Sequence, residues 1–191
     1  MADAARAETR YTSERYFALV DAGVLHPDDR VELLEGVIVA MPPQNPRHAA
    51  ATTQADDALR DAVGKRAVVR VQLPLVLGVH SAPEPDVAIV PGRASDYAEA
   101  HPTAALLVVE VAESSLLQDR LSKAAIYAAA GIPEYWLVNL RDDCIEVFRA
   151  PEAATGRYAS RSVAHRGTRL QLVAFPDASV LADDLLPGRA S

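Results

Sequence analysis

The sequence is poor in the residues that build thiolate or histidine metal centres. Cys144 is the single cysteine among 191 residues, which excludes an intrachain disulfide and a cluster of cysteine ligands. The five histidines are scattered, without a His-x-x-x-His pair, and no glycine-rich phosphate loop is present. Any metal site in this chain would therefore depend mainly on carboxylates.

Long apolar runs and excess positive charge are also missing. No segment approaches the roughly 20 apolar residues of a membrane helix, and the polar, alanine-rich start does not resemble a signal peptide. We expect a cytoplasmic protein that does not bind membranes, with a flexible arm over residues 1–11 and one domain over residues 12–187. The formal net charge of -7 argues against tight nonspecific DNA binding, because nucleic-acid binders usually have a basic face. The overall charge does not exclude a local basic patch. The candidate residues for such a patch form two groups: Arg60, Lys65, Arg66 and Arg70, then Arg157, Arg161, Arg166 and Arg169.

The pattern of apolar and turn residues predicts a mixed order of helices and strands. Regular alternation of strand and helix is absent, so we expect an α/β fold with a central mixed β-sheet flanked by helices. Thr12 or Ser13 is expected to cap a first short helix. Two further helices are predicted over residues 48–63 and 118–130, and a hairpin is predicted over residues 30–40. One or two strands, broken by Pro74, are predicted over 67–77. Further strands are predicted over 86–90, 106–111, 134–140, 144–148, 157–163 and 168–173, and residues 175–191 as an irregular or short helical tail.

Two carboxylates lie within the most apolar strands. Asp86 opens the run Asp86-Val-Ala-Ile-Val90, where it is either an exposed residue at the strand end or a ligand. Glu110 interrupts the run from Leu106 to Ala112, which is expected to be buried on both faces. A buried carboxylate requires a cation, a metal or a proton, so Glu110 either pairs with an arginine or contributes to a metal site.

Lys123 follows on a predicted helix, where Asp119, Lys123 and Tyr127 share one face. Its simplest role is an exposed ion pair with Asp119. The alternative is chemical, because two carboxylates bind a divalent ion such as Mg²⁺, which lowers the pKa of a bound water. A lysine beside them can orient that water or stabilise developing negative charge.

The chain resembles the Uma2 family of the PD-(D/E)XK restriction-endonuclease-like superfamily. The resemblance extends from about Tyr11 to Leu186, and its most specific part is the block from Lys123 to Asn139, which contains Tyr127, Gly131 and Glu-Tyr-Trp at 134–136. Further matching elements are Pro85-Asp86-Val87, Leu107-Val-Val-Glu110-Val111, Glu32-Leu-Leu-Glu35-Gly36, and Met41-Pro-Pro followed by His48.

This resemblance implies a restriction-endonuclease-like core and a set of site residues. Asp86 and Glu110 would bind Mg²⁺ or Mn²⁺, helped by the Val111 carbonyl, with Glu32 as a further acidic member. The superfamily lysine often stands two residues after the second acid, where this chain has Ala112. The resemblance therefore implies that Lys123 takes the lysine's role from the following helix.

For some side chains the sequence is compatible with two alternative roles or orientations. Glu32 and Glu35 point to opposite faces of a strand, so a shift of one residue in the hairpin would exchange them; we prefer Glu32. His48 either contacts substrate or caps its helix, and we expect the structural role. The pair Tyr135-Trp136 is expected in the core, with a base-stacking platform as the alternative.

Two functions compete at this point. The first is a Mg²⁺-dependent endonuclease that hydrolyses phosphodiester bonds of nucleic acid, expected to be DNA, as a homodimer. The second is a noncatalytic dimeric interaction or regulatory module built on a nuclease fold, which the acidic composition favours.

Overall fold

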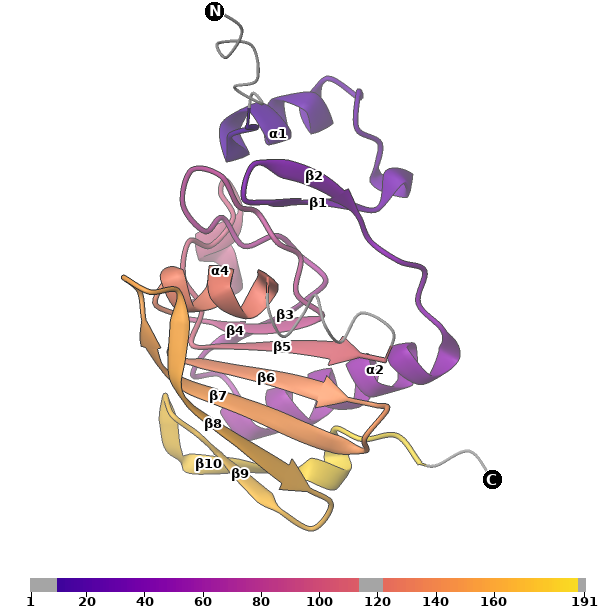
Figure 1. Ribbon diagram of the computed structural model, residues 1–191, viewed down its shortest axis with the longest axis vertical. Helices are drawn as coiled ribbons and strands as arrows, with labels where there is room; N and C mark the ends of the chain where they lie inside the picture. The colour runs from indigo at the N-terminus through magenta and orange to yellow at the C-terminus, as the bar shows by residue number, and fades with distance from the viewer. Residues whose placement is uncertain (1–9, 114–121, 189–191) are drawn as a thin grey trace, which may run out of the picture.

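A six-stranded mixed sheet forms the centre of the computed structural model, which describes residues 10–113 and 122–188 (Figure 1). The strand order is β3-β4-β5-β6-β7-β8, and only β5 and β6 are parallel neighbours. This arrangement confirms the predicted mixed sheet. The strands are β3 (Val68–Val71), β4 (Val87–Val90), β5 (Leu107–Ala112), β6 (Glu134–Asn139), β7 (Cys144–Glu152) and β8 (Arg157–His165).

The central strands are buried on both faces, as their apolar sequences require. Every residue of β4, β5 and β6 is buried. Alternate residues of β5 enter different cores: Val109 lies in the cluster on one face, while Val108 and Ala112 lie in the cluster on the other. Glu110 shares the face of Val108 and Ala112, because side chains alternate along a strand.

Helices and a hairpin cover the two faces (Figure 1). Helix α2 (Pro46–Val63) and the hairpin of β9 (Arg169–Leu172) and β10 (Phe175–Leu181) pack on the face that carries Val109. Helix α4 (Ala124–Ala129) packs on the opposite face. The short 3-10 helices η2 (Ala94–Tyr97) and η4 (Ala182–Asp184) lie in connections.

The N-terminal part forms a separate layer at one end of the sheet (Figure 1). It contains α1 (Ser13–Asp21), η1 (Pro27–Asp29) and the hairpin of β1 (Val31–Leu34) and β2 (Val37–Ala40). A bridge between Leu33 and Ala82 joins β1 to the loop that precedes β4, and the Gly36 amide donates to the His80 carbonyl. These backbone bonds hold the N-terminal layer against the loop that precedes β4, near the ends of the central strands.

Several predicted boundaries differ from the structure. Of the predicted strand over 67–77, only β3 forms, and Gln72 has a positive φ of 50° just after it. Helix α4 is described from Ala124, and residues 118–121 of the predicted helix lie outside the described residues. The tail was expected to lack strands, but β10 pairs with β9 across an irregular register.

Two further predictions concern the ends of the chain and the membrane. Residues 1–9 of the predicted arm lie outside the described residues, while the Tyr11 amide donates to the Gly36 carbonyl. The described helices include none that is long and apolar enough to span a bilayer.

Glu134 joins three strands from a fully buried position. Its Oε1 accepts hydrogen bonds from Trp136 Nε1 at 2.9 Å and Arg149 Nε at 2.8 Å, and its Oε2 accepts one from the Val173 amide at 2.9 Å. This carboxylate therefore fixes β7 and the β9–β10 hairpin against β6.

We expect Glu134→Ala to lower the free energy of unfolding by about 3 kcal/mol, because it leaves buried donors without an acceptor. Urea denaturation measures the loss, and Glu99→Ala, at an exposed position, serves as the control with a change within about 0.5 kcal/mol. Equal, small losses in both variants would contradict the assigned role of Glu134.

Candidate functional site

Asp86 immediately precedes β4, and Glu110 lies on the neighbouring strand β5. The antiparallel register of β4 and β5 pairs Val87 with Val109, so the next position places Asp86 opposite Glu110. Directly opposed residues have Cβ atoms about 4.5–5.5 Å apart and project from the same face. Both residues are buried, at 7% and 3% exposure.

Asp86 is held by three partners from different segments. Its Oδ2 accepts the Val111 amide at 2.8 Å and lies 3.3 Å from His48 Nε2, while its Oδ1 accepts Gln72 Nε2 at 3.1 Å. The amide and carbonyl of one strand residue point to the same side, so the Val111 carbonyl also faces the space beyond the start of β4. Two carboxylates and one carbonyl thus converge at this edge of the sheet.

Lys123 connects two of the three predicted acidic members of the site. Its Nζ lies 3.1 Å from Glu110 Oε1 and 3.1 Å from Glu32 Oε1, and the lysine itself is 7% exposed. The side chain therefore reaches the strand ends from just before α4. Asp119, its predicted partner, lies outside the described residues.

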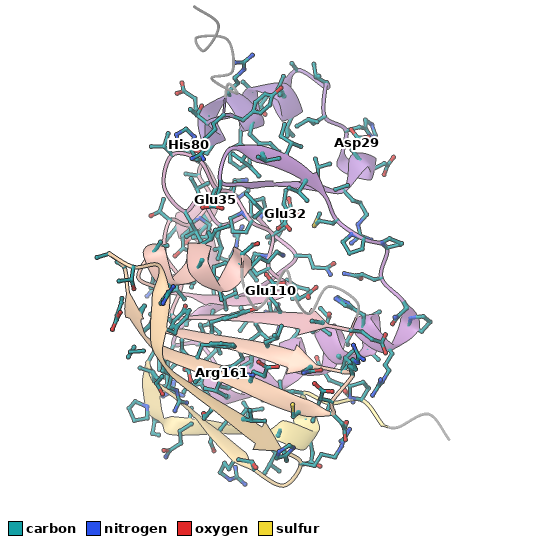
Figure 2. The ribbon with its side chains drawn as sticks, viewed as in Figure 1. Asp29, Glu32, Glu35, His80, Glu110 and Arg161 are labelled. Carbon is teal, nitrogen blue, oxygen red and sulfur yellow. The ribbon has the colours of Figure 1, made fainter. Side chains whose placement is uncertain are left out.

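Glu32 and Glu35 occupy different environments (Figure 2). Glu32 is buried on β1, and its Oε2 accepts the Glu84 amide at 3.1 Å. Glu35 is exposed in the turn of the hairpin, with a φ of 49°. The geometry thus favours the preferred residue, Glu32.

His48 does not cap its own helix. Asn45 Oδ1 accepts the His48 amide at 2.9 Å, and Asn45 is the N-cap of α2. The His48 ring instead has Nδ1 3.4 Å from Thr52 Oγ1. The expected capping role is therefore wrong, and the ring lies beside Asp86 instead.

Tyr127 is a site residue that the sequence analysis placed only on the face of Lys123. Its hydroxyl donates to Glu110 Oε1 at 2.5 Å, and the residue is fully buried. Burial, followed by the charge of Glu110, raises the pKa of Tyr127 well above its usual 10. The hydroxyl therefore stays protonated and acts as a donor that orients Glu110.

The site carries more buried negative charge than positive charge in its described residues. Glu32, Asp86 and Glu110 are buried acids, and Lys123 is the one lysine or arginine among the buried residues. Burial, followed by the charge of Glu32, raises the pKa of the nearby Glu84 to about 7. This excess of carboxylates over cations is the arrangement that a bound cation would neutralise.

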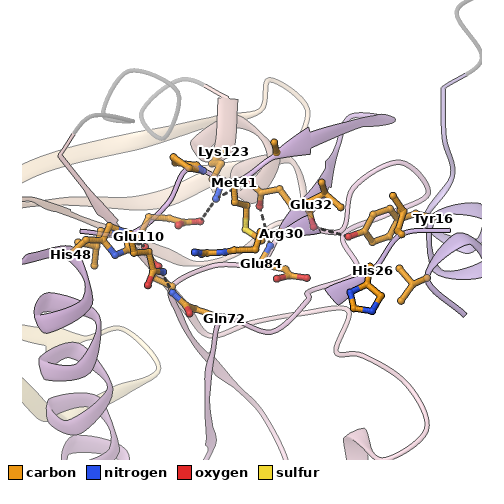
Figure 3. A pocket seen from close by; sticks show the side chains of 18 residues that line it. Tyr16, His26, Arg30, Glu32, Met41, His48, Gln72, Glu84, Glu110 and Lys123 are labelled. Carbon is orange, nitrogen blue, oxygen red and sulfur yellow. Dashed lines mark hydrogen bonds and ion pairs between the residues drawn. The ribbon is translucent and has the colours of Figure 1, made fainter. Parts of the chain in front are cut away.

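These side chains line a pocket of about 450 Å³ (Figure 3). Figure 3 shows Glu110 and His48 toward one end, Tyr16 and His26 toward the other, and Met41 and Arg30 between them. The first end is acidic. The second is built by residues of α1 and of the segment around the β1–β2 hairpin.

A divalent metal fits the donor set, although the described residues contain no cluster of three or more His, Cys, Asp or Glu side chains suited to a metal. Mg²⁺ commonly takes only one or two protein carboxylates, together with waters and substrate phosphate oxygens. Asp86, Glu110 and the Val111 carbonyl supply oxygen ligands of that kind. The surplus of buried acids over buried cations, which includes these two carboxylates, also favours a cation at this position.

Four of the eight cationic residues considered for a basic patch form ion pairs with acids. Ion pairs join Arg60 to Asp56, Arg66 to Asp177, Arg161 to Glu146 and Arg166 to Asp143. These pairs reduce the positive charge available to a nucleic-acid backbone.

The aromatic pair Tyr135 and Trp136 is fully buried. Tyr135 stacks near Phe148 at a ring separation of 5.3 Å. The predicted core role is correct, and a base-stacking platform at this position is excluded.

Comparisons with known proteins identify the family. The Uma2 family, described as "Putative restriction endonuclease", matches residues 13–184. The chain belongs to the Uma2 family. A solved structure of a "putative nuclease belonging to DUF820" from Anabaena variabilis is similar, with a TM-score of 0.73, 17% identity, and coverage of 91% of this chain and 96% of that one. At this identity the likeness establishes a shared fold, and a search of curated proteins found no match.

We expect Tyr127→Phe to destabilise this Uma2 protein by about 2 kcal/mol, since hydrogen bonds to charged groups contribute about 1.5–3 kcal/mol. Tyr158→Phe is the matched control, because its hydroxyl donates to a neutral acceptor, the Ile132 carbonyl, at 2.9 Å. That variant should lose about 1 kcal/mol. A loss for Tyr127→Phe no larger than for Tyr158→Phe, in urea denaturation, would contradict the charged hydrogen bond to Glu110.

Proposed function

We propose that this Uma2 protein is a Mg²⁺- or Mn²⁺-dependent endonuclease that hydrolyses phosphodiester bonds of nucleic acid. The observation that carries the proposal is the excess of buried carboxylates at the acidic end of the pocket. Family membership supports the same reaction class. Asp86, Glu110 and the Val111 carbonyl would hold the ion.

The side chains around these ligands have separate tasks. A bound divalent ion would supply a water of lowered pKa and would offset negative charge on the phosphate. Lys123 keeps Glu110 and Glu32 in place through its two ion pairs and presents a positive charge to the pocket. Tyr127 orients Glu110 by donating a hydrogen bond.

Asp86 is oriented from the other side of the pocket. Gln72 and the Val111 amide fix its two oxygens, so that the carboxylate does not need to reorganise when a cation binds. Such preorganised charge is the largest contribution in many enzyme sites. His48 lies where its ring can contact both Asp86 and an incoming phosphate.

A homodimer belongs to this proposal, because cutting both strands of a duplex pairs two sites by symmetry. The second candidate is a noncatalytic dimeric interaction or regulatory module. The net charge of -7 and the paired arginines favour it, and the ion triad of Lys123 would then serve stability alone.

We expect the purified protein to nick plasmid DNA in Mg²⁺ or Mn²⁺ and to lose activity in EDTA. Asp86→Asn should lower the rate by about 10²-fold or more, as removal of a preorganised charge in an active site does. Asp57→Asn, at an exposed position of α2, is the matched control and should cleave at the normal rate. Equal cleavage by both variants would place the activity outside this site.

Metal binding separates the two candidate functions without requiring turnover. Isothermal titration calorimetry with Mn²⁺ should show binding to the unmodified protein and to Asp57→Asn, and a loss of at least tenfold in affinity for Asp86→Asn. No heat of binding at millimolar Mn²⁺ in any of the three would favour the noncatalytic module.

A further inference from the structure

The pocket extends well beyond the carboxylates, into a wall that the proposed hydrolysis does not use. Away from the carboxylates the pocket is lined by Tyr16, Val20, Leu25, Ala40 and Met41, together with the polar His26. These residues come from α1, β2 and the segments that adjoin them, so one continuous part of the chain builds this wall. A site that only bound a metal and a phosphate would have no need of it.

The chemistry of this wall is apolar with an aromatic component. The Tyr16 hydroxyl donates to the Val31 carbonyl at 2.8 Å, and burial, with the charges of Glu84 and Glu32, raises the pKa of Tyr16 to about 12. The tyrosine is therefore neutral and its hydroxyl is already engaged. The residue is only 3% exposed, so a ligand would meet the small part of its side chain that lines the pocket. Nucleobases bind in pockets of this composition by stacking and apolar contact.

The depth of the acidic end restricts how a phosphodiester can approach. The side chains of Asp86 and Glu110 are only 10% and 4% exposed, and the fixed N-terminal layer forms the wall across from them. The volume of about 450 Å³ falls within the roughly 300–1,000 Å³ range of pockets that enclose small molecules. A phosphate that reaches the acids would bring its attached nucleoside into the same pocket.

The cations around the pocket indicate contact with few phosphates. In the described part of the chain, Arg30 and Lys123 are the arginine and lysine that line it, and Lys123 already bridges two carboxylates. A protein that grips duplex DNA typically neutralises several phosphates with lysine and arginine. This pocket therefore matches a short stretch of one strand better than a long stretch of duplex.

Resting on the proposed nuclease function, we propose that the site takes an unpaired nucleotide, with the phosphodiester at Asp86 and Glu110 and the base against the wall of Tyr16 and Met41. An intact duplex would have to extrude a base to fill this wall, at an unstacking cost that a single strand or a flap avoids. The substrate class is thus single-stranded nucleic acid or an unpaired end.

The test compares oligonucleotides of one sequence as single-stranded DNA, single-stranded RNA and blunt duplex DNA. Fluorescence anisotropy in Ca²⁺, which also takes oxygen ligands, should show at least tenfold tighter binding of a single strand than of the duplex. The DNA and RNA arms show whether the 2′-hydroxyl contributes. Affinity for the single strand should fall by less than about tenfold between 50 and 200 mM salt, whereas six to ten phosphate contacts would cost about 10³–10⁵-fold.

A matched pair of variants tests the wall itself. Ala40 and Ala159 are exposed alanines on β2 and β8, but only Ala40 lines the pocket. Ala40→Phe should weaken single-strand binding at least tenfold, and Ala159→Phe should change it less than twofold, with circular dichroism verifying that both variants fold. Equal affinities for duplex and single strand, or normal binding by a folded Ala40→Phe, would overturn the inference.

Hydrolysis of methyl p-nitrophenyl phosphate, a phosphodiester without a base, separates this inference from the proposed function. Turnover of that compound together with equally tight duplex binding would refute the unpaired substrate and leave the nuclease proposal standing. Selective binding of the single strand, with no hydrolysis of any substrate in Mg²⁺ or Mn²⁺, would refute the nuclease proposal and keep the assignment of the pocket.

Discussion

The ion triad of Lys123 with Glu32 and Glu110 is the interaction on which the rest of the site depends. It joins three parts of the chain that are distant in sequence: the N-terminal hairpin, the central strand β5 and the segment that opens α4. Because all three groups are buried, loss of the lysine would leave two buried carboxylates without their cation, a change that costs about 3–5 kcal/mol in comparable buried pairs. Lys123 therefore joins the hairpin to β5 at the pocket and supplies positive charge to it.

The charge balance of the pocket follows from that arrangement. With Lys123 shared by two acids, Asp86 depends on hydrogen bonds from Gln72 and the Val111 amide and on the neighbouring His48. A cation at this edge would complete the compensation of negative charge. The wall around Tyr16, with its apolar side chains, gives the same pocket a second chemical character.

Much of this site could be predicted from strand periodicity and from one sharp anomaly. A glutamate within a run as apolar as that of β5 requires a partner, and this requirement singled out Glu110. The hairpin was also predictable, whereas the choice between Glu32 and Glu35 needed its register. Tyr127 appeared on the face of Lys123, but its hydrogen bond depends on how α4 packs against β5, which no local pattern encodes. The strand β10 escaped prediction because Pro176 and Asp177 interrupt its alternation, and because it is stabilised by pairing with β9 and packing near α2, which are distant in sequence or not locally encoded.

The most direct test of the central claim is a crystal structure of the protein soaked in Mn²⁺, with anomalous scattering recorded. The account predicts an anomalous peak within coordination distance of both Asp86 and Glu110, close to the Val111 carbonyl. A fully soaked crystal with no peak there, or with Mn²⁺ bound only elsewhere, would contradict it.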